Sequence, residues 1–166
     1  MPFDLHPEYP AEGVYRSELE KRYGAGFIDH VRAFIENEGM EYGPPDKSPR
    51  SVASLQVSEL ARDRDRFEEL HERMFRAYWA EGRDIGDREV LVSVGIDARL
   101  EPAEINHVLD NDIYLDRLQS STRTAHDAGV SGVPAWVIDH RYLIPGAQPH
   151  EVFERVLERL GYSPIA

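Results

Sequence analysis

Histidine and acidic side chains are the first residues in this chain that could support chemistry. His71-Glu72 opens like the zinc-protease pattern His-Glu-x-x-His, but Phe75 stands at the position of the second histidine. Two further pairs combine an imidazole with a nearby carboxylate, namely His107 with Asp110 and His126 with Asp127. Such a pair is more often a solvated ion pair than a metal site, because a protein-bound ion usually has more ligands. We therefore expect no metal centre.

Nucleophilic groups are equally sparse. The chain contains no cysteine, which removes thiol nucleophiles, disulfides and thiolate metal ligands together. Ser120 and Ser121 lack the Gly-x-Ser-x-Gly context of a hydrolase nucleophile, and the sequence has no glycine-rich phosphate loop. The residues by themselves give no catalytic constellation, so we predict no catalytic residue.

Two turns could bind a ligand through their backbone groups. If the Val133-Pro134 bond is cis, the N–H and C=O of Val133 are free to pair with an extended, peptide-like ligand. The bend around Ala147 and Gln148 leads into a helix, whose positive end favours a carboxylate. The alternative, which the local residues by themselves favour, is that both segments only turn the chain.

The segment from Gly129 to Pro149 must position both turns. Aromatic and β-branched residues favour a short strand over 135–138, and Pro134 stands at its start, where a sheet tolerates proline. A turn at 139–141 and a second strand from Tyr142 complete a predicted β-hairpin. Pro149 then opens the last helix.

Helical periodicity accounts for most of the remaining chain. Apolar residues at helical spacing predict helices over 15–23, 27–38, 65–81, 101–109 and 112–128, all but 101–109 followed by glycine. Two more helices are predicted to begin after Ser51 and Asp87. Ser51 and Asp87 are the predicted N-caps of those two. The aromatic stripe of 65–81, which includes Phe75, is predicted to lie in the core.

The balance of charges restricts the partners. With 31 acidic and 19 basic side chains, the net charge is −12 and no basic patch stands out, so we expect neither nucleic acid nor an anionic membrane as partner. No apolar run approaches the roughly 20 residues that cross a bilayer, and the first residues lack a secretory signal. Together with the absence of cysteine, these features predict a cytoplasmic protein.

The chain also carries four ordered motifs, at Pro2 to Pro7, Glu81 to Asp87, Gly129 to Pro134 and Ile144 to Pro149. These motifs resemble the FrnE-like branch of the DsbA family, which includes relatives of 2-hydroxychromene-2-carboxylate isomerase and kappa-class glutathione transferase. The resemblance covers essentially the whole chain. It implies an α/β fold, α+β in content: an incomplete thioredoxin-like fold with a large all-α insertion and a C-terminal β-β-α unit.

The resemblance also implies domains and site residues. It divides the chain into 1–14 (a remnant of the second thioredoxin strand and a linker), 15–128 (the helical insertion) and 129–166 (the C-terminal half of the thioredoxin domain). Pro134 would be the family's cis-proline, and Val133 would pair with a peptide or a small thiol substrate. The start of the last helix can hold glutathione in the family. Glutathione-using relatives tend to carry Ser-Asp where this chain has Ala147-Gln148, which argues against glutathione, and no other cofactor is expected.

The main departure from the family lies at the front. Family members begin with a strand, a Cys-x-x-Cys-type motif and a helix, whereas this chain begins at the later segment Met1-Pro2-Phe3. We therefore expect a relative of the protein-disulfide oxidoreductases without dithiol activity, because exchange needs a thiolate. One alternative is a cysteine-independent isomerase or transferase that uses glutathione. The other is a non-enzymatic module that dimerises through an exposed sheet edge.

Overall fold

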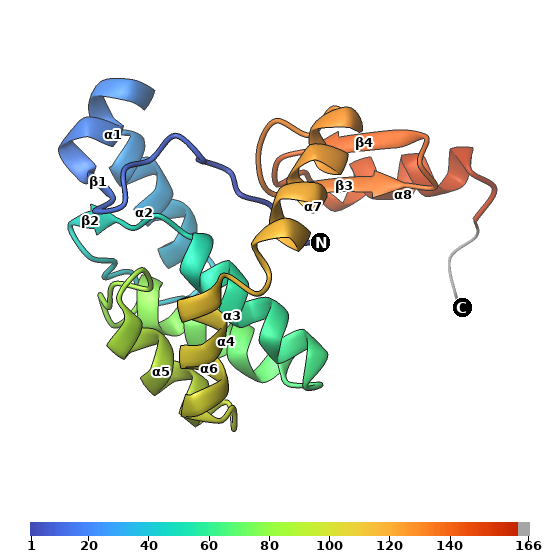
Figure 1. The fold of residues 1–166 in the computed structure, drawn as a ribbon. Coiled ribbons are helices and arrows are strands. Elements are labelled where there is room, and N and C mark those ends of the chain that lie inside the picture. Colours follow the sequence, from blue (N-terminus) through green and yellow to red (C-terminus); the bar gives the residue numbers. More distant parts are fainter. Residues whose placement is uncertain (163–166) are drawn as a thin grey trace. The chain divides into compact units, whose positions relative to one another are not determined.

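The computed structural model describes residues 1–162, and it contains two compact units (Figure 1). The larger unit comprises Pro2 and residues 4–118, and the smaller one comprises Met1, Phe3 and the described residues from 119 to 162. The division falls inside helix α7 (Leu115–Asp127). No helix in the described part of the chain combines the length and the apolar character needed to cross a membrane.

The larger unit is almost entirely helical. Its helices are α1 (Arg16–Tyr23), α2 (Phe27–Asn37), α3 (Val52–Asp63), α4 (Phe67–Trp79), α5 (Arg88–Asp97) and α6 (Pro102–Asn111). Two short strands, β1 (Val14–Tyr15) and β2 (Lys47–Ser48), pair antiparallel. The helices predicted in this part of the chain are therefore present. The β1–β2 pair is present too, but the sequence did not predict it.

The core of the larger unit lies between α3, α4, α5 and α6. Leu70, Leu91 and Ile105 are completely buried there, and each comes from a different helix. Fully burying one such side chain contributes roughly 1.5–3 kcal/mol. The shared apolar cluster therefore holds these four helices together.

The ends of two helices test the capping predictions. Asp87 caps α5 as predicted, because its Oδ1 accepts hydrogen bonds from the backbone N–H groups of Glu89 (2.8 Å) and Val90 (3.1 Å). The prediction for Ser51 is wrong, since its side chain makes no capping bond to α3. Ser51 already has a helical backbone (φ −82°, ψ 0°) rather than the extended one that a capping side chain needs.

The aromatic stripe of α4 is only partly buried. Leu70 and Met74 lie in the core, but Phe75 is 54% exposed, so its predicted core position is wrong. The Phe75 ring packs instead against His71 (centroids 4.5 Å apart), which in turn stacks on Phe67. The core partners α3 and α5 cover one side of α4 and leave Phe75 outside.

The smaller unit is built around the predicted hairpin. β3 (Ala135–Ile138) pairs antiparallel with β4 (Tyr142–Pro145), and α8 (His150–Arg159) lies along the hairpin (Figure 1). Asp139 and His140, between the strands, both have positive φ, as in the mirror-image turns whose twist suits a hairpin. The ring of Trp136 packs edge-on against Phe153 of α8, with centroids 5.0 Å apart.

Residues 1–13 differ from the predicted layout. The resemblance places a remnant of a strand in 1–14, but residues 1–13 form none, and the first strand is Val14–Tyr15. The only strand paired with β3 in the described residues is β4. A strand needs a neighbouring strand to accept and donate its backbone hydrogen bonds. A segment with a strand-like sequence but no such neighbour therefore does not form one.

The start of α7 and the boundary between the units also differ from expectation. Asp112, the predicted start of that helix, has a left-handed backbone (φ 48°) that ends α6, so α7 begins at Leu115. The compact units divide between residues 118 and 119 rather than 128 and 129. The Phe3 ring packs edge-on against His126 in the second half of α7, within the smaller unit.

Candidate functional site

The segment just before β3 is the candidate site that the sequence singles out. The Val133–Pro134 peptide bond is cis. Both residues are exposed, Val133 by 56% of its surface. The carbonyl of Pro134 accepts a hydrogen bond of 2.8 Å from the N–H of Gly146. This bond brings the bend after β4 directly beside Pro134.

The same bond fixes the direction of the backbone groups along β3. In an antiparallel pair, hydrogen-bonded and non-hydrogen-bonded residue pairs alternate. Pro134 is bonded to Gly146, so in the observed register Trp136 bonds with Ile144, while Ala135 faces Pro145 without such bonds. A proline at 145 suits this pattern, because it has no N–H to donate.

The open edge of β3 therefore presents the backbone groups of alternate residues. Ala135 and Val137 direct their N–H and C=O away from β4, because their pairs with β4 are the non-hydrogen-bonded ones. Val133 precedes them at the same two-residue spacing, and within residues 1–162 its N–H and C=O take part in no hydrogen bond. We refer to Val133, Ala135 and Val137 as the β3 edge.

The two faces of the hairpin are covered unequally. Trp136 and its partner Ile144 share the face that α8 covers; Ile144 is buried there, although Trp136 is still 41% exposed. Val137 and its partner Leu143 share the opposite face, where Val137 is 42% exposed. Apolar surface therefore lies open next to the β3 edge.

Ala147 and Gln148, the other predicted binding residues, form the bend before α8, and both are exposed. The side-chain Nε2 of Gln148 donates to the carbonyl of Pro145 at 2.8 Å, so this amide closes the bend. The first turn of α8 carries Glu151, whose charge opposes an anion at this helix end. The bend thus stabilises the geometry beside Pro134 without offering an obvious carboxylate site.

Of the histidines singled out in the sequence, His71 and His107 belong to the larger unit, and His126 packs against Phe3 in the smaller one. His71 is sandwiched by aromatic rings on α4, and His107 is hydrogen-bonded to Asn111 within α6. Among the described residues, no three histidine, aspartate or glutamate side chains gather in a way that could hold a metal ion. Ala135 and Val137 were missed by the sequence interpretation, although strand alternation after Val133 was the signal that could have found them.

Known proteins are similar to this chain over nearly its whole length. The sequence profile of the DSBA-like thioredoxin domain matches residues 1–158. The uncharacterized protein YwbO of Bacillus subtilis (strain 168) is 26% identical over 160 residues, which is 95% of this chain and 78% of YwbO.

A solved structure is similar over the same range. The crystal structure of a probable DsbA oxidoreductase from Streptomyces coelicolor has a TM-score of 0.85 and 29% identity to this chain. The match covers 99% of this chain and 76% of the Streptomyces chain. The thioredoxin-like fold with its helical insertion, expected from the four motifs, is confirmed. The chain belongs to the family of DSBA-like thioredoxin domains.

Proposed function

We propose that this chain binds extended polypeptide by strand addition at the β3 edge, without thiol chemistry of its own. The observation that carries the proposal is the backbone of Val133, which is exposed and has no hydrogen-bonding partner within the described residues. Unpaired N–H and C=O groups along a strand edge are a template for another strand. Val133, Ala135 and Val137 offer such groups in sequence.

The side chains near the edge indicate which polypeptides would bind. Val137 and Leu143 are partly exposed on one face of the hairpin, so an added strand with apolar residues at alternate positions would cover them. No basic or acidic side chain belongs to the β3 edge. Affinity would therefore come from backbone hydrogen bonds and apolar contact.

The absence of cysteine separates this role from the family's redox chemistry. Thiol–disulfide exchange begins with attack by a thiolate, and this chain supplies none. A bound polypeptide would be held but not oxidised, reduced or isomerised by residues of this chain. The related proposal that glutathione binds near Ala147 and Gln148 has less support, because the Gln148 amide is already bonded to Pro145.

The test uses peptides that can add a strand on one edge only. The parent is a fluorescently labelled, extended peptide rich in valine. Two variants of it are N-methylated at alternate residues, so that each variant loses the N–H groups along one edge of the peptide strand. Strand addition predicts that one methylated version binds as the parent does. The affinity of the other methylated peptide should be roughly fivefold or more lower, because each lost hydrogen bond costs about 1 kcal/mol.

Fluorescence anisotropy measures the affinities, at protein concentrations below those at which sedimentation detects a dimer, since a second copy would compete for the edge. Val137→Pro removes an N–H from the β3 edge and should weaken binding, whereas Val137→Ala keeps that N–H and serves as the matched control. Equal binding of both methylated peptides would show that no strand is added.

A further inference from the structure

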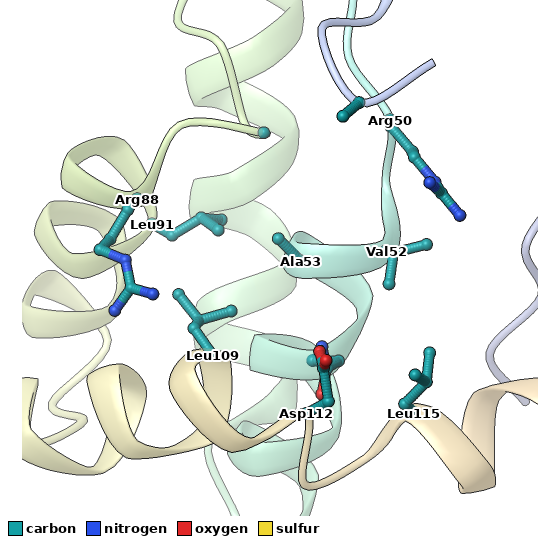
Figure 2. Close-up of a pocket in the computed structure, with 11 residues that line it drawn as sticks. Arg50, Val52, Ala53, Arg88, Leu91, Leu109, Asp112 and Leu115 are labelled. Carbon is teal, nitrogen blue, oxygen red and sulfur yellow. The ribbon is translucent and has the colours of Figure 1, made fainter. Parts of the chain in front are cut away.

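The larger unit contains a pocket that lies outside the candidate site in the smaller unit. Its volume is about 420 Å³, within the usual range for small-molecule sites. The lining comes from the segments before β1, α3 and α5 and from four helices. Its aliphatic residues are Ala11, Val52, Ala53, Leu91, Leu109 and Leu115. Figure 2 shows these side chains together with two arginines, Arg50 and Arg88, on opposite sides of the view.

Arg50 is the group in this pocket that lacks a partner. Its Nε is buried and has no hydrogen-bond acceptor, and within residues 1–162 no carboxylate lies within ion-pair distance of its guanidinium. The Arg50 side chain as a whole is partly exposed, but its buried Nε–H without an acceptor is costly, so such groups are normally paired. The chain has 31 acidic side chains, yet none of those described neutralises Arg50.

The other polar groups of the pocket are already engaged. Arg88 donates to Asp110 (2.7 Å) and to Asn106 (2.9 Å). Gln56 donates to Asp112 at 2.9 Å, and its amide oxygen accepts from the N–H of Tyr114. Recognition of a charged ligand therefore depends on Arg50.

The charge distribution also gives a ligand its orientation. Asp112 is the one carboxylate among the lining residues, and Figure 2 places it at a different end of the pocket from Arg50. An anionic group is attracted to Arg50 and repelled from Asp112. The first turn of α3, which includes Val52 and Ala53, contains no acidic residue, so the positive end of this helix is not neutralised locally.

We propose that this pocket binds a small organic monocarboxylate with an apolar body. The carboxylate pairs with the guanidinium of Arg50, a geometry for which arginine is well suited. The apolar body packs against Val52, Ala53 and Leu115, which line the pocket and are only partly buried. A phosphate dianion fits less well, because a single unpaired arginine and an aliphatic wall do not compensate a second charge.

The test compares two probes of nearly equal shape, 2-naphthoate and naphthalene-2-methanol, by isothermal titration calorimetry on the full chain. The wild type should bind the acid roughly tenfold or more tightly than the alcohol, because a charge-assisted hydrogen bond distinguishes them. Arg50→Gln should remove this preference and leave the alcohol unaffected. Arg73→Gln is the matched control, since Arg73 is exposed on α4 and does not line the pocket.

A second variant tests the volume of the pocket separately from its charge. Ala53→Leu fills part of the space and should weaken both probes, with circular dichroism used to verify that each variant is folded. The proposal is overturned if the wild type binds neither probe at millimolar concentration, if it binds both equally, or if Arg50→Gln keeps the preference for the acid. None of these results bears on strand addition at the β3 edge.

Discussion

Asp87 shows what a single side chain contributes at the residue scale. Its carboxylate satisfies two backbone N–H groups at the start of α5, those of Glu89 and Val90, which have no acceptor within the helix. We expect Asp87→Ala to lower the free energy of unfolding of the larger unit by about 1 kcal/mol. Urea denaturation followed by circular dichroism measures this loss.

The control for this prediction is Asp87→Asn, which keeps a side-chain oxygen at the cap and removes only the charge. Asparagine caps helices about as well as aspartate, so the control should retain most of the stability. If Asp87→Ala and the wild type unfold at the same urea concentration, the cap contributes nothing and the interpretation is wrong.

At this scale the sequence is informative when the determining contacts are local. Asp87 is recognisable because its hydrogen bonds reach only two and three residues along the chain. Arg50 is not recognisable, because its lack of a partner depends on residues far away in sequence. The N-cap prediction for Ser51 is wrong for a related reason. Its helical backbone angles depend on how the preceding loop enters α3, and the residue type alone does not determine that path.

At the scale of elements, an ionic network joins α3 to the start of α7. Arg117 donates to both Glu59 (3.1 Å) and Asp63 (3.0 Å), and the hydroxyl of Tyr114 donates to Asp63 at 2.8 Å. The guanidinium of Arg117 and, to a smaller extent, the Tyr114 hydroxyl hold the pKa of the Asp63 carboxyl below its usual range. Folding therefore favours the ionised form of Asp63.

This lowered pKa predicts a pH dependence of stability. A carboxyl whose folded pKa lies below its unfolded value stabilises the fold above the unfolded pKa of about 4. That contribution disappears as the pH falls through the folded pKa. Between pH 7 and about pH 3, the wild type should therefore lose more stability than Asp63→Asn, which cannot titrate at this position.

Urea midpoints at the two pH values measure the effect, and Asp97→Asn, at an exposed position on α5, is the control. The control should lose as much stability between the two pH values as the wild type. An equal loss in Asp63→Asn would mean that the Arg117 network does not stabilise the ionised carboxylate.

The elements themselves were largely predictable, but their partners were not. Amphipathic periodicity gives the helices and the hairpin, because each pattern is complete within its own segment. It does not show what covers an apolar face: Phe34 on α2 and Leu157 on α8 remain exposed although both helices are strongly amphipathic. The pairing of Val14 with Ser48 was missed because two-residue strands carry almost no periodic signal.

At the scale of the whole molecule, the family was predictable because four motifs occur in the expected order. Membership in the DSBA-like thioredoxin domains fixes the fold and the place of the Val133–Pro134 segment before β3. It does not determine the activity, since the chain lacks the cysteines on which the family's dithiol chemistry depends. We propose that the β3 edge instead binds polypeptide by strand addition.

Strand addition at the β3 edge can be detected by amide hydrogen exchange, resolved by residue with NMR. With a saturating extended peptide, we predict slower exchange at Val133, Ala135 and Val137, because their N–H groups gain acceptors from the added strand. Trp136 should change little, since its backbone is already bonded to β4. Unchanged exchange at the β3 edge, with the peptide shown to be bound, would contradict the account.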